Sequence, residues 1–500
     1  MKGKVYLVGA GPGDYKLMTL KGIECIKKAD VIVYDRLAND KYLKEAKENC
    51  EFIYVGKASS NHVLPQDQIN EVITKKAKEG KIVTRLKGGD PYVFGRGGEE
   101  AEFLLDNNID FEVVPGITSA IGGLCYAGIP ITHRDYASSF HVITGHLKDD
   151  ENDELNWNAL ANNKGTLVFL MGIANLKKIS ENLIKEGKSK DTPVALISWA
   201  TRYNQRVVTA TLENVYETAI IEKVKPPTLI VVGDVVKLRD KLNFFENKPL
   251  FGKNILVTRA RTQSSKLVEK IIDLGGNPIE VPTIKIEKIE NNLELEKEIK
   301  NIKEYNYLIL TSQNGVNIFF DKLNSMNLDI RALSNLKICA VGPATAKELK
   351  SRGIIADIVP EKFVAEAMYD ELKSILKKED KILIPRGANA RDFLVDKLSE
   401  ICTIKEVHTY KTVLEDENKE EIISLLNEEI VDYITFTSSS TVSNFIDIIG
   451  KENIDKLKNV KVISIGPITS NTAKELGLEV YKEPTNYTIN DLIDCIIKDN

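Results

Sequence analysis

The chain has 500 residues, of which 43% are apolar and 28% are charged, with a formal net charge of −5. This length predicts two or more domains, because single cores stop growing at about 300 residues. Balanced charge argues against nucleic acid as a partner. No apolar run reaches the roughly 18 residues of a membrane helix, and no signal-peptide pattern precedes the first strand. We therefore expect a cytoplasmic protein without a membrane partner.

In the first half, short apolar runs alternate with helical stretches. Runs such as KVYLVG (4–9) and KIVTRLKG (81–88) read as strands, and QDQINEVITKKAKEG (66–80) reads as a helix. This alternation predicts an α/β domain with a largely parallel sheet. From residue 138 the strand-like runs become denser, which indicates a second lobe. We expect a domain over 1–245, with lobes of about 1–117 and 118–245, and a linker over 246–252.

The second half, 253–500, repeats itself. NILVTRA (254–260) resembles KILIPRG (381–387), and YLILTSQNGVNIFF (307–320) resembles YITFTSSSTVSNFI (433–446). A third pair is KICAVGPATAKELKSRGI (337–354) and KVISIGPITSNTAKELGL (461–478). The three pairs occur in the same order at nearly equal offsets, so they predict a duplicated α/β unit.

The first strand runs into GAGPGD, residues 9–14, where three glycines form a turn. A dinucleotide fingerprint would place its third glycine where Asp14 stands. We expect the Asp14 carboxylate to face the turn and to repel a pyrophosphate. Two more glycine-rich loops, RLKGGDPYVFGRGGEE (85–100) and VVPGITSAIGG (113–123), allow a ligand to approach the backbone closely.

Together these segments resemble the uroporphyrinogen-III C-methyltransferases, which are tetrapyrrole methylases. The resemblance extends from residue 3 to about 240 and includes YDRL (34–37), AGIPITHR (127–134), FLMG (169–172) and PTLIVVGD (227–234). It implies a two-lobed α/β fold of the class III methyltransferases, which is distinct from the Rossmann methyltransferases. It also implies S-adenosylmethionine as co-substrate and a tetrapyrrole as substrate.

The second half resembles the uroporphyrinogen-III synthases through LTSQNGV (310–316), HTYKT (408–412), FTSSSTV (436–442) and EPTNYTINDL (483–492). The resemblance implies a two-lobed α/β domain with interleaved lobes, one of residues 253–286 and 411–500 and the other of 287–410. It also implies that a linear hydroxymethylbilane is closed to uroporphyrinogen III with inversion of one ring and loss of water. The first half would then transfer two methyl groups to this product, giving precorrin-2.

The resemblance assigns roles to individual residues. Asp35 is the candidate proton acceptor and Lys57 the candidate donor in methylation, although a helix cap and a solvated lysine are the alternatives. Tyr410 is the candidate for assisting hydroxyl departure, with a hinge aromatic as its alternative. Ala200 stands where related enzymes often have glycine. The cofactor-binding candidates are Pro12, Gly88, Gly89, Asp90, Val93, Thr118, Ser119, Met171, Ala200 and Thr228. The substrate-binding candidates are Arg36, Arg85, Lys87, Arg96, Arg134, Ser312, Ser438, Ser439 and Thr469.

Two other interpretations remain open from the sequence. One is an NAD-dependent oxidoreductase fused to a two-lobed binding module. The other is a methylase that acts on a later corrin intermediate. The six cysteines form no CxxC pair, so we expect neither a disulfide framework nor a metal site. The resemblance implies a homodimer formed through the methylase half. The sequence does not decide whether the end product of the pathway is sirohaem or a cobalamin.

Overall fold

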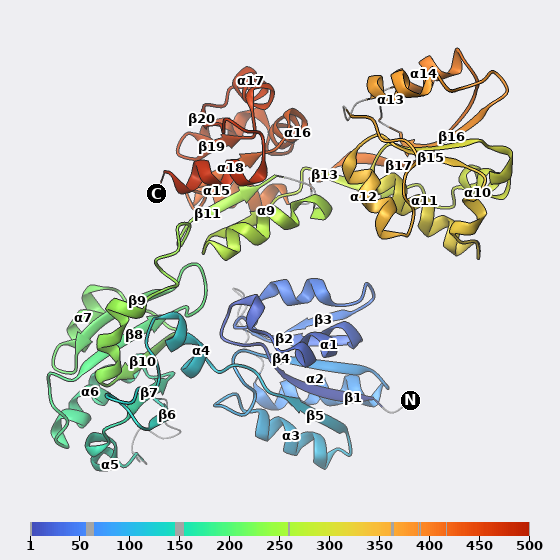
Figure 1. Cartoon of the computed structure of the whole chain (residues 1–500). Helices are drawn as coiled ribbons and strands as arrows, with labels where there is room; N and C mark the ends of the chain where they lie inside the picture. Colours follow the sequence, from blue (N-terminus) through green and yellow to red (C-terminus); the bar gives the residue numbers. More distant parts are fainter. Residues whose placement is uncertain are drawn as a thin grey trace. The chain divides into compact units, whose positions relative to one another are not determined.

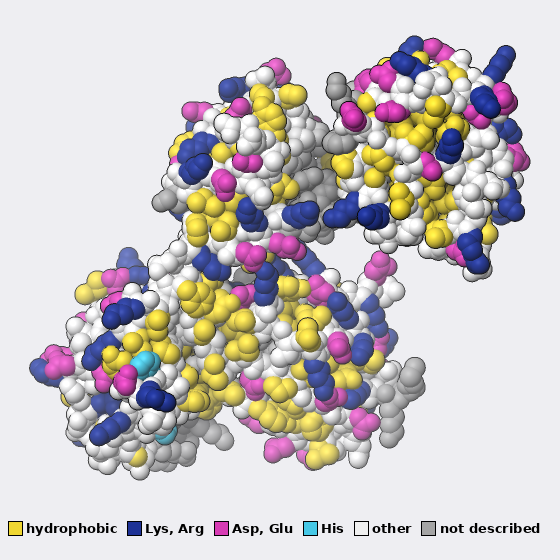
Figure 2. Space-filling view, in the orientation of Figure 1, with side chains coloured by type: hydrophobic (Ala, Val, Ile, Leu, Met, Phe, Trp, Pro, Cys, Tyr) yellow, Lys and Arg dark blue, Asp and Glu magenta, His cyan; other side chains and the backbone are white. Residues whose placement is uncertain are grey.

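The computed structural model describes residues 3–56, 65–145, 155–258, 261–361, 365–388, 390, 392–416 and 418–499, with the backbone alone for 261–265. In these residues the strands form four five-stranded sheets (Figure 1). Contacts divide the chain into two units, residues 1–254 with 269–278 and 497–500, and residues 255–268 with 279–496. Within the described ranges no helix is long and apolar enough to cross a membrane. On the face drawn in Figure 2, Lys and Arg side chains are interspersed with Asp and Glu side chains.

The first sheet is entirely parallel, in the order β3-β2-β4-β1-β5. Its strands are β1 (Lys4–Gly9), β2 (Val31–Tyr34), β3 (Glu51–Tyr54), β4 (Ile82–Lys87) and β5 (Asp110–Val114). Its helices are α1 (Leu20–Lys28), α2 (Gln66–Lys78), α3 (Gly97–Asp106) and the short η1 (Tyr15–Leu17) and η2 (Asp40–Glu45). Because successive strand residues face opposite ways, one face of the sheet buries α2 and α3 and the other buries α1 and η2.

The second sheet is mixed, in the order β6-β7-β10-β8-β9. Only β6 and β7 pair in parallel among the strand pairs described in it. Its strands are β6 (Phe140–Thr144), β7 (Thr166–Leu170), β8 (Pro193–Ser198), β9 (Arg206–Thr211) and β10 (Thr228–Val232). Its helices are α4 (Ser119–Tyr126), α5 (Trp157–Asn162), α6 (Leu176–Lys185), α7 (Val215–Ile221) and α8 (Arg239–Leu242). Helix α4 packs on one face, and α5, α6 and α7 pack on the other.

The third and fourth sheets belong to the second half of the sequence. The third has the order β12-β11-β18-β19-β20 and the fourth the order β13-β17-β16-β14-β15. The third comprises β11 (Asn254–Val257), β12 (Asn277–Glu280), β18 (Tyr433–Phe436), β19 (Lys461–Ser464) and β20 (Val480–Lys482), with α9 (Arg261–Asp273), α15 (Lys419–Asn427), α16 (Ser439–Ile449), α17 (Pro467–Glu475) and α18 (Ile489–Ile497). The fourth comprises β13 (Ile284–Lys288), β14 (Tyr307–Leu310), β15 (Lys337–Ala340), β16 (Lys381–Gly387) and β17 (Thr403–Leu414), with α10 (Leu293–Lys300), α11 (Gln313–Ser325), α12 (Pro343–Ser351), α13 (Ala365–Leu372) and α14 (Phe393–Ser399).

The internal repeat of the sequence appears as three equivalent neighbouring strands in these two sheets. The order β11-β18-β19 in the third sheet matches β16-β14-β15 in the fourth. The first copy of the repeat contributes β11, β14 and β15, and the second contributes β16, β18 and β19. Each sheet therefore takes these three neighbouring strands from both copies.

The chain enters the fourth sheet at β13 and leaves it at β17. These two strands pair antiparallel from Ile284 with Leu414 to Lys288 with Tyr410. The expected lobe limits at 286/287 and 410/411 fall inside this ladder, so both strands lie wholly in the fourth sheet. Because the ladder between the two strands is continuous, the chain crosses between the sheets before Ile284 and after Leu414.

The carboxyl ends of β1 and β5 approach each other more closely than side chains permit. A Cβ atom at Gly116 would lie 2.7 Å from both the Cα atom and the carbonyl carbon of Gly9 and would also overlap the Gly89 carbonyl oxygen. All three contacts are with backbone, which cannot rotate away as a side chain can. The sequence therefore needs glycine here to bring the three loops of the first sheet together.

Replacing Gly116 by alanine should destabilise the first unit by about 1–3 kcal/mol, because overpacking forces the backbone apart. Gly98 is a matched control, since a Cβ there meets no atom within 4 Å and the residue lies in α3. Gly98→Ala should leave the free energy of unfolding unchanged or raise it by up to about 1 kcal/mol. Chemical denaturation of both variants checks this, and equal stabilities would contradict it.

Candidate functional site

The glycine turn after β1 is joined to the loop after β4. Gly11 donates to the Gly89 carbonyl at 3.1 Å, and Gly89 donates to the Gly11 carbonyl at 2.7 Å. Both residues have left-handed backbone, with φ of 72° and 70°, which side chains disfavour. The joined loops form one edge at the carboxyl ends of the parallel strands, where open α/β sheets bind ligands.

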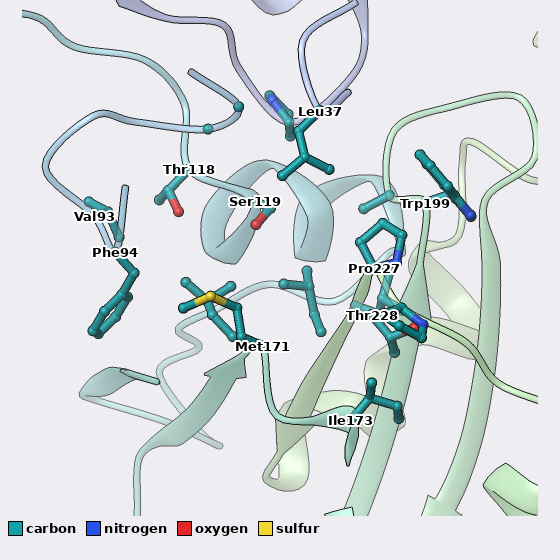
Figure 3. Close-up of a pocket in the computed structure, with 18 of the residues that line it drawn as sticks. Leu37, Val93, Phe94, Thr118, Ser119, Met171, Ile173, Trp199, Pro227 and Thr228 are labelled. Atoms are coloured by element: carbon teal, nitrogen blue, oxygen red, sulfur yellow. The ribbon is translucent and has the colours of Figure 1, made fainter. Parts of the chain in front are cut away.

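A cavity of about 500 Å³ opens at this edge (Figure 3). Figure 3 shows Thr118 and Ser119 on the α4 side of the cavity and Met171 and Ile173 on the β7 side. Residues from both sheets of the first unit line it. Nine of the ten predicted cofactor-binding residues are among them, namely Pro12, Gly88, Gly89, Val93, Thr118, Ser119, Met171, Ala200 and Thr228.

Asp90, the tenth predicted residue, does not line the cavity. Its carboxylate accepts hydrogen bonds from the backbone N–H of Tyr92 at 2.8 Å and of Gly116 at 2.9 Å. Oδ1 therefore closes the loop after β4, and Oδ2 holds this loop against the segment after β5. Cofactor binding by Asp90 stays a prediction.

Several lining residues were missed by the sequence analysis. Trp199 and Arg202 flank the predicted Ala200, and Pro227 precedes the predicted Thr228. The guanidinium groups of Arg36 and Arg202 lie 5.8 Å and 5.1 Å from the centre of the Trp199 ring. The only signal in the sequence for these residues was that they lie close to predicted ones. The left-handed backbone at Trp199, with φ of 48°, could not be predicted from the sequence.

Asp35 follows β2 and makes two contacts with the protein. Oδ1 accepts from the Leu37 backbone N–H at 3.0 Å, and Oδ2 accepts from Arg85 at 3.1 Å. Asp35 thus closes a turn and does not cap a helix, because the next helical segment, η2, has Asn39 as its N-cap. The next two residues, Arg36 and Leu37, line the cavity. Lys57, the predicted proton donor, lies outside the described residues.

Arg85 and Lys87 were predicted to hold substrate carboxylates, and their placement corrects this prediction. Arg85 is 4% exposed, Lys87 5% and Glu100 1%. Lys87 donates to Glu100 Oε1 at 2.7 Å, and Arg85 Nε lies 3.5 Å from the same oxygen. Burial lowers the pKa of Lys87, and the neighbouring Arg85 charge acts in the same direction. Arg85 and Lys87 therefore form a buried ion cluster with Glu100.

The other predicted cations are exposed. Arg96 begins α3 and pairs with Glu99 three residues later, and Arg134 lies in a surface turn. Arg36 lines the cavity. These three side chains can therefore reach an anionic ligand in solution, whereas the buried pair cannot.

The Asp14 carboxylate does not face the glycine turn as expected. Oδ1 accepts from the Lys16 backbone N–H at 2.8 Å, and Oδ2 accepts from the Tyr126 hydroxyl at 2.7 Å. Burial, aided by Asp14, raises the pKa of Tyr126 well above its usual range. Asp14 thus caps η1 and ties the turn to α4, so repulsion of a pyrophosphate is not the basis of ligand choice here.

In the fourth sheet, Tyr410 and Ser312 are brought together. Their hydroxyl groups lie 2.9 Å apart, and Tyr410 is 9% exposed at the end of the pairing between β16 and β17. Ser312 also caps α11, accepting from the Gly315 backbone N–H at 3.0 Å. The pair joins two residues that are 98 positions apart in the sequence.

In the third sheet, Ser438, Ser439 and Thr469 lie at the starts of α16 and α17. Ser438 caps α16 in a capping box with Thr441. The Ser439 hydroxyl donates to the Ile468 carbonyl at 3.3 Å, which links the two helix starts. Thr469 is buried in the first turn of α17.

Metal ligands do not gather anywhere in the described ranges. No group of three or more His, Cys, Asp or Glu side chains is arranged there to hold an ion. All six cysteines are free thiols.

Comparisons with known proteins assign both halves. The family model of the tetrapyrrole (corrin/porphyrin) methylases matches residues 4–216, and that of uroporphyrinogen-III synthase HemD matches residues 265–494. The porphyrin biosynthesis protein HemD of Ruminiclostridium josui is 43% identical over 99% of this chain and 98% of its own length. A uroporphyrinogen-III C-methyltransferase of Bacillus subtilis is 44% identical over 71% of this chain and 73% of its own length. That of Priestia megaterium is 53% identical over 47% of this chain and 98% of its own length.

These matches span the chain from the first strand to the last helix. They contradict the oxidoreductase interpretation of the first half, because the family that matches this half is a methylase family. The chain therefore belongs to the tetrapyrrole methylases through its first half and to the uroporphyrinogen-III synthases through its second half.

Proposed function

We propose that the chain catalyses two consecutive steps of tetrapyrrole synthesis. The second half closes hydroxymethylbilane to uroporphyrinogen III, and the first half transfers two methyl groups to that product, giving precorrin-2. The observation that carries the methylase assignment is the single cavity lined by nine of the predicted donor-binding residues. The product of one half is the substrate of the other, which gives the fusion a chemical purpose.

The cavity suits an adenosyl group. Its volume lies within the range of about 300–1,000 Å³ that is usual for small-molecule sites. Gly88 and Gly89 present backbone, Met171 and Ala200 present apolar walls, and the Thr118 hydroxyl lies among the few polar groups. S-adenosylmethionine supplies an electrophilic methyl group when bound. The residues of this chain would hold it so that the methyl group points toward the acceptor carbon.

The acid–base roles in methylation are assigned to Asp35 and Lys57, as the resemblance implies. Asp35 would accept the proton that leaves the methylated ring, and Lys57 would return a proton to the substrate. Arg36, Arg96 and Arg134 would pair with substrate carboxylates, because charge-assisted hydrogen bonds are the strong ones. Arg85 and Lys87 are not part of this set, since their charges are buried.

Two measurements test the methylase proposal. In calorimetric titration, adenosylhomocysteine should bind to the full chain and NAD should not. Mass analysis of the products from uroporphyrinogen III and S-adenosylmethionine should show addition of two methyl groups. A singly methylated end product would instead favour a methylase of a later corrin intermediate, and tight binding of NAD would overturn the proposal.

The synthase half would work through hydroxyl groups. Tyr410 would donate a proton to the departing hydroxyl of the bilane, so that the C–O bond breaks with loss of water. Ser312, at 2.9 Å, would orient the Tyr410 hydroxyl. Ser438, Ser439 and Thr469 would bind bilane carboxylates at the starts of α16 and α17, where helix N-termini favour negative charge.

Replacing Tyr410 by phenylalanine should slow bilane closure by about 100-fold, the usual scale for a positioned acid. Methylation of supplied uroporphyrinogen III should not change. Tyr305→Phe is the matched control, because Tyr305 is equally buried, lies two residues before β14 of the same sheet and donates to Glu298 at 2.6 Å. Initial rates of uroporphyrinogen III formation check this, and equal rates for both variants would reduce Tyr410 to a packing residue.

Four further expectations belong to this proposal. The domains extend over 1–245 and 253–500, and the linker over 246–252 begins at Glu246, which is bonded to the methylase half. The methylase half forms a homodimer, which light scattering of the full chain tests. The enzyme works in the cytoplasm and needs no metal.

A further inference from the structure

The side-chain amide of Gln205 lies at the centre of a buried hydrogen-bond network beside the cavity. Gln205 is 4% exposed. Its Oε1 accepts from the Thr201 backbone N–H at 2.8 Å, and its Nε2 donates to the Tyr126 carbonyl at 3.2 Å and to Glu246 Oε1 at 2.8 Å. One amide therefore joins the loop after β8, the end of α4 and the segment after α8.

The loop after β8 requires such support. Trp199 and Thr201 both have left-handed backbone, with φ of 48° and 68°, which L-residues with side chains disfavour. This conformation places Trp199 and Ala200 on the wall of the cavity. The hydrogen bond from Thr201 to Gln205 holds the strained residue from inside the protein.

The same loop also holds the glycine turn. The Asp14 backbone N–H donates to the Thr201 hydroxyl at 2.9 Å. A Cβ at Gly13 would lie 3.0 Å from that hydroxyl, so the two loops are in direct contact. Asp14 in turn accepts from Tyr126, whose carbonyl accepts from Gln205. The network is thus a closed ring around one wall of the cavity.

Glu246 anchors the outer end of the network. Its Oε2 accepts from Arg239, which also donates to the Ala127 carbonyl at 2.6 Å. The neighbouring Phe245 is 6% exposed, and its ring centre lies 4.7 Å from that of Tyr126. The segment that leads out of the methylase half is therefore packed against the end of α4.

We propose that Gln205 is a positioning residue for the methyl donor, and that Glu246 acts through it. Gln205 keeps the loop of Trp199, Ala200 and Thr201 in the conformation that lines the cavity, so that donor binding does not have to order it. This inference rests on the proposed binding of an adenosyl ligand in the cavity. It also places Glu246, which the sequence assigned to the linker, within the methylase site.

Replacing Gln205 by leucine should weaken binding of adenosylhomocysteine to the full chain about tenfold or more, as expected when the competent loop falls to about a tenth of the population. KM for S-adenosylmethionine should rise by a similar factor. The value of kcat at saturating donor and KM for uroporphyrinogen III should stay within about threefold, because Gln205 touches neither reactant and affects only the loop population.

Lys188→Met is the control for general destabilisation. Lys188 is half-buried and donates to the Ala161 and Asn163 carbonyls at 3.2 Å and 2.8 Å on the α5 side of the second sheet. This variant should lower the melting temperature and leave the affinity for adenosylhomocysteine unchanged. A folded Gln205→Leu protein with affinity within about twofold of the wild type would overturn the inference.

A second pair of variants keeps the test decisive if Gln205→Leu does not fold. Glu246→Gln retains an oxygen that accepts from Gln205, so this variant should bind adenosylhomocysteine with an affinity within about twofold of the wild type. Glu246→Leu leaves one N–H of the Gln205 amide unpaired, so it should bind about threefold more weakly or worse. Equal affinities for the two variants would overturn the inference. Failure of the wild type to bind adenosylhomocysteine would instead contradict the proposed function.

Discussion

Replacing Asp35 by asparagine should reduce the rate of methylation by about 100-fold or more, the usual contribution of a general base. Asparagine retains the Oδ1 acceptor that caps the Leu37 N–H at 3.0 Å, so the loop that carries Arg36 and Leu37 into the cavity stays in place. What it loses is the ability to take up a proton, together with the oxygen that accepts from Arg85 at 3.1 Å. Initial rates with uroporphyrinogen III and S-adenosylmethionine give the measurement.

Two readouts separate this loss from misfolding. The affinity for adenosylhomocysteine and the rate of bilane closure should both remain within about twofold of the wild type, because neither depends on proton transfer to Asp35. Asp30→Asn is the matched control at the other end of β2, where Asp30 accepts from the Ile82 N–H at 2.8 Å and pairs with Lys47. That variant should methylate normally. An unchanged rate for Asp35→Asn would leave Asp35 as a cap and a partner of Arg85.

Replacing Glu100 by alanine should cost about 3–5 kcal/mol of unfolding free energy in the methylase half, because it leaves Lys87 and Arg85 buried without their shared anion. Glu100 is 1% exposed and also accepts from Gln66 at 3.0 Å. The effect on the first unit is measured by denaturing the full chain and using the loss of adenosylhomocysteine binding as the signal for unfolding.

The destabilisation by Glu100→Ala should shrink as the pH rises from 7 toward 10. Burial holds the pKa of Lys87 below its ordinary value of 10.5, and removal of Glu100 lowers this pKa further. The unfolded chain then binds more protons than the folded one, so stability rises with pH, by at most about 1.4 kcal/mol per pH unit for one proton. The loss of unfolding free energy caused by Glu100→Ala does not disappear at high pH, because Arg85 stays charged.

Glu213→Ala serves as the control for the loss of a salt bridge. Glu213 pairs with Lys190 at 3.0 Å on the surface, where both side chains are more than half exposed. Such pairs contribute about 0–1 kcal/mol, and no pH dependence in this range is expected. Equal losses for Glu100→Ala and Glu213→Ala would show that the buried cluster is dispensable.

Much of the cavity could be predicted from the sequence because its residues come from loops with distinctive composition. Glycine-rich turns and the threonine at the start of α4 are local signals, since a tight turn or a helix cap depends on a few neighbouring residues. Nine of the ten donor-binding predictions accordingly line one cavity. The side chains of Asp14, Arg85 and Lys87 were placed wrongly because their direction depends on partners that lie elsewhere in the sequence.

The fold shows the same division. The sequence by itself determined the class of each half, since the periodicity of strands and helices and the duplicated segments in 253–500 are local patterns. Only the tertiary structure decided that β11 of the first copy lies beside β18 of the second, 177 or more residues along the chain. It also decided that Glu100 neutralises Lys87 and that Gln205 supports the cavity wall. Strand order and buried polar partners follow from long-range packing, which no short window of sequence contains.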